Sequence, residues 1–208
     1  MSLLGRKKVP LSETKISSDY KTFTSSRRNV TKIILIGDSG VGKTSLIQRL
    51  INAEFTHSLD PTVGVNLTTK KFSFATNNPE VLVFTDVSGQ KRFADVRKAY
   101  YKGIEIVLAV CDITNKKSLE NLEQIWIPEF VQSNPLDDGL RIKIQLIGNK
   151  SDLTKSTEIS RKDLDASANK IHFLFPEVSV LKPCLLTSAK EDLYVNESFG
   201  VPKGVVFT

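Results

Sequence analysis

Short apolar runs alternate with amphipathic stretches along most of the chain. The apolar runs, which predict buried strands, lie at residues 31–36, 81–84, 108–114, 145–148 and 184–187. The stretches with helical spacing lie at residues 45–51, 92–101, 118–132 and 161–169. Trp126 is spaced helically from Leu122 and Phe130, so we expect it in the core. Strands interleaved with helices predict an α/β fold, with helices on both faces of a mostly parallel sheet.

One segment departs from this pattern. Residues 65–74 alternate apolar and polar side chains, which is typical of a strand with one solvated face. Asn77, Asn78 and Pro79 then turn the chain toward the run at 81–84, so we expect an antiparallel hairpin at one edge of the sheet. About 170 residues are enough for one domain with its own core.

The first apolar run leads directly into a glycine-rich segment. Its residues, Gly37-Asp38-Ser39-Gly40-Val41-Gly42-Lys43-Thr44, fit the pattern G-x-x-x-x-G-K-[ST]. A strand, a glycine-rich turn and a helix in this order form a loop whose backbone N–H groups bind phosphates. Lys43 adds charge for the outer phosphates, and the Thr44 hydroxyl is suited to Mg²⁺. The alternative is a glycine-rich turn with an exposed lysine.

A second polar motif follows the run at 81–84. Asp86 stands where a carboxylate can hold Mg²⁺ through water, opposite Thr44. Gly89 lets its backbone N–H approach a γ-phosphate, and Gln90 is suited to orient an attacking water. These residues predict hydrolysis of a nucleoside triphosphate.

Two further motifs indicate which base is bound. Residues 149–152 read Asn-Lys-Ser-Asp, and the Asp152 carboxylate can accept the N1–H and 2-amino groups of guanine, a pair that adenine lacks. Residues 188–190 read Ser-Ala-Lys, and the Ala189 amide can donate to guanine O6. Asn-Lys-x-Asp alone is more often a surface turn, and an ATP-using enzyme would require it to be accidental. Because ligands of such sheets bind at the carboxyl ends of strands, the four motifs together favour a guanine nucleotide.

With these motifs, residues 30–199 resemble the Ras superfamily of small GTPases. The resemblance implies a P-loop NTPase fold with a six-stranded sheet and one antiparallel edge strand, and GTP or GDP with Mg²⁺ as ligands. By spacing, Thr62 matches the threonine that closes over Mg²⁺ and the γ-phosphate. Phe55 matches the aromatic residue on the guanine face. The alternative for Phe55 is a core position that caps the first helix.

The motifs and the resemblance together define one set of site residues. The expected nucleotide contacts are Asp38, Ser39, Gly40, Val41, Gly42, Lys43, Thr44, Ser45, Phe55, Thr62, Gly89, Asn149, Lys150, Asp152, Ser188, Ala189 and Lys190. The expected Mg²⁺ ligands are Thr44, Thr62 and Asp86. The residues expected to act in hydrolysis are Gln90, Lys43 and Thr62.

Four segments resemble the Rab subfamily. They are residues 63–67, 90–93, 100–103 and 108–114. The resemblance implies a monomeric switch in vesicle traffic, with slow GTP hydrolysis and with effectors, an exchange factor and a GAP reading residues 55–67 and 86–101. Three residues depart from the Rab pattern: Thr85 replaces Trp, Ser88 replaces Ala, and Lys91 replaces Glu. They keep a second hypothesis open, a nucleotide-binding interaction module with little or no turnover.

Basic charge gathers at the start of the chain. Residues 1–32 hold eight lysines and arginines against two acidic residues, which accounts for the net charge of +6. The remaining residues balance, so a nucleic-acid-binding surface is not indicated. Residues 1–29 are weakly apolar and rich in Ser and Thr, and we expect them to be disordered. They are either a solvated leader or an arm that contacts an anionic membrane surface.

The last part of the chain carries several expectations. Residues 200–208 form a short tail, and no cysteine follows Cys184, so we expect no C-terminal prenylation. The chain is either a fragment of something longer or works without a lipid. Extra sequence around 170–183 is either a lengthened connection or an apolar docking patch. Cys111 and Cys184 are expected to be buried thiols, and without a secretory leader they favour a cytoplasmic protein that can attach peripherally to membranes.

Overall fold

The computed structural model describes residues 30–57, 59–73, 79–134, 142–201 and 207. Of residues 72, 73, 79 and 80 it describes the backbone alone. The expectations for the N-terminal arm, for the turn at 77–78 and for most of the tail lie outside these residues. None of the helices in the described ranges has the length and apolarity needed to cross a bilayer.

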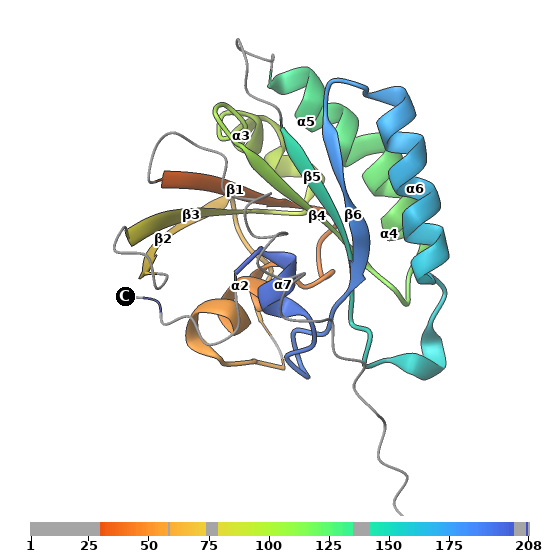
Figure 1. Ribbon diagram of the computed structural model, residues 1–208, viewed down its shortest axis with the longest axis horizontal. Helices are drawn as coiled ribbons and strands as arrows, with labels where there is room; N and C mark the ends of the chain where they lie inside the picture. Colours follow the sequence, from red (N-terminus) through yellow and green to blue (C-terminus); the bar gives the residue numbers. More distant parts are fainter. Residues whose placement is uncertain (1–29, 58, 74–78, 135–141, 202–206, 208) are drawn as a thin grey trace, which may run out of the picture.

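The sheet has six strands, and Figure 1 shows its twist. The strands are β1 (Val30–Ile36), β2 (Val65–Ser73), β3 (Pro79–Val87), β4 (Ile106–Asp112), β5 (Lys143–Asn149) and β6 (Ser179–Leu186). Their order is β2-β3-β1-β4-β5-β6. Only β2 runs antiparallel to its neighbour, β3, while the other strands pair in parallel. The predicted parallel sheet with one antiparallel edge is confirmed.

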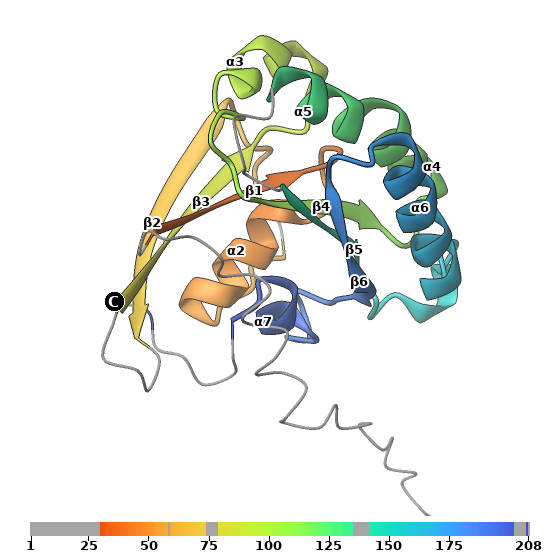
Figure 2. The same cartoon turned by 45° about the horizontal axis from the view of Figure 1, so that its top comes forward.

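Helical segments cover both faces of the sheet (Figures 1 and 2). They are α2 (Lys43–Asn52), η1 (Lys91–Phe93), α3 (Ala94–Lys98), α4 (Lys116–Asn121), η2 (Leu122–Trp126), α5 (Ile127–Ser133), η3 (Thr154–Ser156), α6 (Arg161–Leu174) and α7 (Val195–Ser198). Helices α2 and α7 lie against one face, and α4, α5 and α6 lie against the other. The segments α4, η2 and α5 follow one another without a break, and η2 is a π-helical turn.

The central strand β1 shows why two hydrophobic layers form. Ile33 and Leu35 face the layer that contains Leu46 of α2, whereas Ile34 and Ile36 face the layer beneath α4, η2 and α5. This division follows the two-residue period of a strand, and all four side chains are fully buried. Because β1 is clamped on both faces, the loop that follows Ile36 leaves the sheet in a fixed direction.

The observed helices differ from the predicted stretches in extent and in type. Helix α6 continues past 169 to Leu174, because Ile171 is buried against the sheet and accepts the backbone N–H of Phe175. The extension takes up the first part of the extra sequence at 170–183. The stretch 118–132 contains the π-helical turn, and the stretch 92–101 holds a short 3₁₀ turn followed by α3, which ends at Lys98. The predicted buried thiols, Cys111 and Cys184, are buried and free.

Candidate functional site

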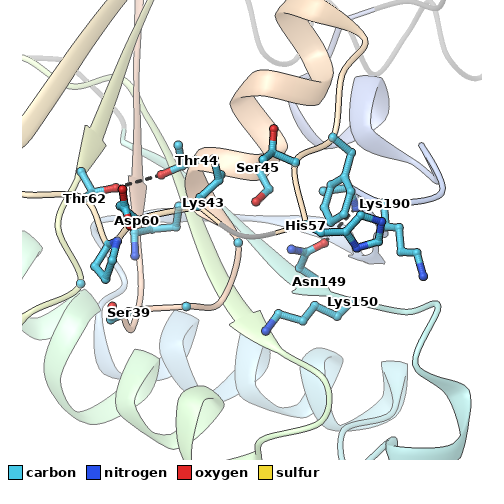
Figure 3. Close-up of a pocket in the computed structure, with 18 of the residues that line it drawn as sticks. Ser39, Lys43, Thr44, Ser45, His57, Asp60, Thr62, Asn149, Lys150 and Lys190 are labelled. Atoms are coloured by element: carbon cyan, nitrogen blue, oxygen red, sulfur yellow. Dashed lines mark hydrogen bonds between the residues drawn. The ribbon is translucent and has the colours of Figure 1, made fainter.

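The carboxyl ends of the parallel strands and the N-terminus of α2 surround a cavity of about 500 Å³ (Figure 3). Fourteen of the residues predicted from sequence line it: Ser39, Gly40, Gly42, Lys43, Thr44, Ser45, Phe55, Thr62, Gly89, Asn149, Lys150, Asp152, Ala189 and Lys190. The other lining residues are Thr56, His57, Leu59, Asp60, Pro61 and Leu153. Sequence analysis missed these six, although each lies within a few positions of a residue that it named.

Two glycines allow close packing around the phosphate loop. Gly42 has φ 98°, and a Cβ there would lie 2.2 Å from Asn149 Nδ2, so no side chain fits. Gly89 packs equally closely, because a Cβ would lie 2.2 Å from the backbone nitrogen of Ser39. The segment after β3 therefore lies directly on the loop after β1, as expected if both approach the same phosphate.

Lys43 folds back over this loop. Its Nζ donates to the carbonyl oxygens of Gly37 at 2.7 Å and Asp38 at 2.8 Å. Burial lowers the pKa of Lys43 to about 8, although the carboxylates of Asp86 and Asp38 act to raise it. A phosphate beside Nζ would restore the preference for the charged form, so this lysine suits an anionic ligand.

A cluster of oxygens lies at the same end of the cavity. Thr44 Oγ1 donates to Asp86 Oδ2 at 2.6 Å and lies 3.0 Å from Thr62 Oγ1, as Figure 3 shows for the two threonines. Asp86 Oδ1 is buried and has no hydrogen-bond partner among the described residues. Burial raises the pKa of Asp86 above its usual value, against the Thr44 hydrogen bond and the charge of Lys43.

This oxygen cluster fits Mg²⁺. Two hydroxyls and one carboxylate with a spare buried oxygen are hard ligands, and Mg²⁺ completes its shell with water and phosphate oxygens rather than with a cage of side chains. Within the described ranges, no group of three or more His, Cys, Asp or Glu side chains gathers to hold a metal. Thr44, Thr62 and Asp86 are thus brought together, as predicted.

Asn149 joins the phosphate end of the cavity to the base end. Its Nδ2 donates to the carbonyl of Val41 at 2.9 Å. Its Oδ1 accepts from Thr187 Oγ1 at 3.2 Å and from the backbone N–H of Ala189 at 3.3 Å. Asn149, at the end of β5, therefore links the phosphate loop to the segment that follows β6. The Ala189 N–H, which sequence analysis assigned to guanine O6, donates here to Asn149 through a long bond.

The other end of the cavity has the polar groups expected for a base. Asp152 Oδ1 accepts a hydrogen bond from Ser188 Oγ at 2.7 Å, which fixes the carboxylate. Lys150 has φ 67°, and its Nζ lies 2.6 Å from Asp112 Oδ2. Phe55 lines the cavity with its ring edge-to-face with that of His57, at 5.2 Å between centroids, and it also packs against the core cluster beneath α2. Both interpretations of Phe55 thus have a contact to support them.

Five predicted residues lie outside the cavity lining: Asp38, Val41, Asp86, Gln90 and Ser188. Val41 is a core residue, and Ser188 is fully buried behind Asp152. The carboxylate of Asp38 accepts from Trp126 Nε1 and Asn121 Nδ2, each at 2.7 Å, and so faces away from the cavity. These contacts support the site rather than line it.

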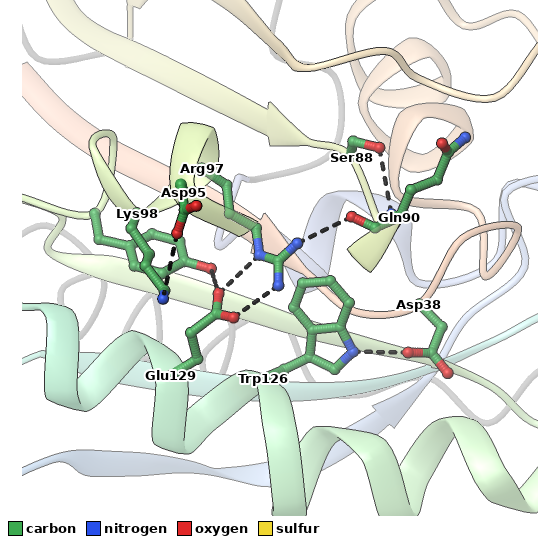
Figure 4. Close-up of polar contacts among 9 residues, drawn as sticks. Asp38, Ser88, Gln90, Asp95, Arg97, Lys98, Trp126 and Glu129 are labelled. Atoms are coloured by element: carbon green, nitrogen blue, oxygen red, sulfur yellow. Dashed lines mark hydrogen bonds and ion pairs between the residues drawn. The ribbon is translucent and has the colours of Figure 1, made fainter. Parts of the chain in front are cut away.

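Gln90 lies at the start of the segment that sequence analysis expects to switch. Its backbone N–H donates to Ser88 Oγ at 3.3 Å, and its side-chain Oε1 accepts from Arg92 Nε at 2.8 Å. Figure 4 shows the side chain extending away from the buried groups below it. In this conformation the carboxamide is occupied by Arg92, and it must leave Arg92 to reach a water in the cavity.

Comparison with known proteins agrees with this geometry. A sequence model of the Ras family matches residues 32–200. The chain is 31% identical over 177 residues to the Ypt/Rab-type GTPase YPT7 of Saccharomyces cerevisiae, covering 85% of this chain and 81% of that one. It is 33% identical over 168 residues to the Ras-related protein Rab-22A of Mus musculus, covering 81% and 79%. It is 36% identical over 179 residues to the Ras-related protein Rab7 of Pisum sativum, covering 84% and 81%.

The family match spans every strand of the sheet except the first two residues of β1, and all four motifs. Family members bind GTP and GDP with Mg²⁺, hydrolyse GTP, and work with effectors, exchange factors and GAPs. The geometry of the cavity agrees, because it offers a phosphate loop and an oxygen cluster at one end and a fixed carboxylate at the other. The chain belongs to the Ras family of small GTPases, and Rab-type proteins are among its relatives.

Proposed function

We propose that this GTPase is a Rab-like switch of membrane traffic whose two states are set by GTP and GDP in this cavity. One observation carries the proposal: the Thr44–Thr62–Asp86 cluster and the Asp152–Ser188 pair lie at opposite ends of the same cavity. A guanosine triphosphate needs both ends, one for its phosphates with Mg²⁺ and one for its base.

We assign the chemistry to the following groups. Thr44, Thr62 and Asp86 would hold Mg²⁺, which when bound offsets negative charge on the β- and γ-phosphates. Lys43 would turn from the loop carbonyls toward the same phosphates. Gln90, released from Arg92, would orient a water in line with the bond between the γ-phosphorus and the β–γ bridging oxygen. The water oxygen bonds to phosphorus as that bond breaks, GDP leaves with the electron pair, and one proton of the water passes to an oxygen of the phosphate product.

The same proposal assigns the switch to residues 55–67 and 86–101, which we expect to order with GTP and to loosen with GDP. Both segments carry exposed apolar side chains, among them Val63, Val96 and Tyr100, that a partner can cover. Ser39 occupies the loop position where an arginine from a GAP would approach. Effectors, an exchange factor and a GAP would therefore read these segments of a monomeric chain.

A second candidate is a nucleotide-binding module with little turnover. Two contacts favour it: Arg92 occupies the Gln90 carboxamide, and Ser88 holds the Gln90 backbone. Lys91 is exposed and adds a positive charge directly beside Gln90, the residue that would orient the attacking water. Slow or absent hydrolysis would follow if Gln90 stayed with Arg92.

One experiment tests the site that both candidates share, and a second separates them. The purified chain is denatured and the released nucleotide identified by chromatography; GDP or GTP supports the site, and an adenine nucleotide contradicts it. Single-turnover GTP hydrolysis is then compared in the unsubstituted chain, in Lys91→Glu and in the nearby exposed control Lys102→Glu. A measurable rate in the unsubstituted chain supports the switch. A rate that appears only in Lys91→Glu supports the binding module.

The remaining expectations concern the parts around the GTPase domain. We propose one such domain over residues 30–199, preceded by an arm (1–29) and followed by a short tail (200–208). The basic arm would bring a cytoplasmic chain to anionic membrane surfaces at up to about 1 kcal/mol per basic residue. Cosedimentation with anionic and neutral vesicles, with and without residues 1–29, tests this proposal. Equal binding of both forms would contradict it.

A further inference from the structure

A buried arginine lies beneath the segment that carries Gln90. Arg97 of α3 is 3% exposed. Its Nη1 donates to the backbone carbonyl of Gln90 at 3.1 Å. Its Nε and Nη2 donate to the two carboxylate oxygens of Glu129, each at 2.7 Å (Figure 4). A buried guanidinium is tolerated only when it is paired, and this bidentate geometry fixes its orientation as well as its charge.

Glu129 is itself held from a second side. The hydroxyl of Tyr101 donates to Glu129 Oε1 at 2.7 Å. Burial by itself would raise the pKa of Glu129, but the hydrogen bonds from Arg97 and Tyr101 outweigh burial and lower it. The carboxylate is therefore charged near neutral pH, and it presents a fixed anchor to Arg97.

The guanidinium also connects to the phosphate loop. It lies over the ring of Trp126, 4.5 Å from the ring centroid. Trp126 Nε1 donates to Asp38 in the loop, and Asn121 Nδ2 donates to the other oxygen of the same carboxylate. Asn121, Trp126 and Glu129 all come from the continuous helical stretch α4–η2–α5, so one rigid element contacts both the loop and Arg97.

These contacts treat the backbone and the side chain of Gln90 differently. The Gln90 carbonyl is fixed through Arg97 to a frame of partly buried Glu129 and buried Trp126. The Gln90 carboxamide, by contrast, is at the surface with Arg92 and can exchange partners. The frame thus defines the point from which the carboxamide swings, and a displacement of about 1 Å at such a point is enough to slow a reaction about a hundredfold.

We propose that Arg97 is a positioning residue for Gln90, and that Trp126 links its position to the phosphate loop through Asp38. The proposal rests on the role of Gln90 in the proposed function. It extends that role by naming what holds the Gln90 backbone in register with the loop. Arg97, Trp126 and Glu129 do not line the cavity, so they would act through Gln90 and Asp38 rather than on the reacting groups.

The test compares Arg97→Met with Lys98→Met. Lys98 is the next residue on α3, is exposed and lies 3.8 Å from the exposed carboxylate of Asp95, so it controls for loss of a positive charge. We expect Arg97→Met to lower single-turnover GTP hydrolysis about tenfold or more while the dissociation constants for GTP and GDP change by less than about threefold. Lys98→Met should leave both unchanged. Equal hydrolysis rates in the two variants would overturn the proposal.

Two readouts do not depend on turnover. The chain has a single tryptophan, so its fluorescence reports on Trp126. We expect Arg97→Met to shift this emission and to speed amide hydrogen exchange at 88–93 about tenfold or more, with neither change in Lys98→Met. If the unsubstituted chain hydrolyses no GTP, the proposed turnover fails. The positioning role of Arg97 is still supported by faster exchange at 88–93 in Arg97→Met, and unchanged exchange there overturns it.

A second variant guards against misfolding. Removing Arg97 alone leaves Glu129 buried without its ion pair, which destabilises a fold. Arg97→Met combined with Glu129→Gln removes both charges and leaves an acceptor for Tyr101. The double variant should repeat the loss of hydrolysis and the faster exchange at 88–93 while its circular dichroism spectrum stays native. Normal exchange and hydrolysis in a folded double variant would overturn the proposal.

Discussion

Lys43 has a buried ammonium group that a bound anion would stabilise. In the free chain its Nζ donates to two backbone carbonyls and lies in the fields of nearby carboxylates, and burial lowers its pKa to about 8. A bound polyphosphate favours the charged form and raises this pKa, so the nucleotide binds the protonated lysine more tightly. The charge of this one side chain therefore makes affinity depend on pH.

We expect GDP affinity to be constant below about pH 8 and to fall above it, by at most about tenfold per pH unit. The fall starts where free Lys43 loses its proton and would end at the higher pKa of the bound form. Calorimetric titration of nucleotide-free protein from pH 7 to 9 measures it. Lys43→Arg, which stays charged, is the control, and an equal slope in this variant would assign the effect to another group.

Asp152 is the second residue with one decisive contact. Ser188 holds its Oδ1, so the carboxylate stays fixed whether or not a base is present. We expect Asp152→Asn to weaken GDP binding more than about a hundredfold, because the amide presents a donor to the donor groups of guanine. Xanthosine diphosphate has a carbonyl in place of the 2-amino group and should bind Asp152→Asn better than GDP does. Fluorescence competition measures both affinities, and unchanged GDP binding would show that Asp152 does not read the base.

At the scale of elements, the stretch α4–η2–α5 both covers one face of the sheet and contacts the phosphate loop. It supplies two hydrogen-bond donors, from Asn121 and Trp126, to a single carboxylate in the phosphate loop. Its π-helical turn, 122–126, ends at Trp126, and such turns are frequent at functional sites. The stretch therefore fixes the phosphate loop through these two hydrogen bonds, which we call the brace.

Removing this brace should cost stability. Asp38→Ala leaves the buried Nε1 of Trp126 and the Nδ2 of Asn121 without an acceptor, and we expect the free energy of unfolding to fall by about 1–3 kcal/mol. Urea denaturation of nucleotide-free protein measures the change. Asp95→Ala is the control, because Asp95 is fully exposed and should shift the midpoint little. Equal midpoints would mean that Asp38 braces nothing.

How far the sequence predicts the molecule depends on how local each signal is. The strands and the phosphate, metal and base motifs are written in short consecutive runs, and the structure brings them to one cavity. The contact of Asp38 with Trp126 joins residues 88 positions apart, and no local pattern predicts that they meet. The expected core position of Trp126 is confirmed, but its hydrogen bond to Asp38 and the burial of Arg97 were not predicted. The end of α6 was missed because Ile171 is fixed by burial in the core, which no local capping signal marks.

For the whole molecule, the hydrophobic layer beneath α2 is completed by residues 195–201. Helix α7 is only four residues long, yet Phe199 after it is buried and packs edge-to-face on Phe84 of β3 at 5.5 Å between centroids. Val201 is buried in the same layer. A short terminal segment thus closes one of the two hydrophobic layers.

We expect Phe199→Ala to lower the free energy of unfolding by about 3–5 kcal/mol, because it opens a cavity in this layer. Phe173→Ala is the matched control, since Phe173 at the end of α6 is 84% exposed. Urea denaturation of both variants, each free of nucleotide, gives the comparison. Similar midpoints would show that the end of the chain closes no layer.

Asn149 has a consequence for how the protein is made. It ties the loop carbonyl of Val41 to Thr187 and Ala189, and Lys190 also lines the cavity, so the cavity is complete only when the chain has reached residue 190. On the ribosome, the early strands must therefore assemble without GDP to stabilise them. Stalled nascent chains that end before Thr187 should retain no labelled GDP, whereas full-length nascent chains released from the tunnel should retain it. GDP therefore binds only after the strands have assembled, and it stabilises a fold that has already formed.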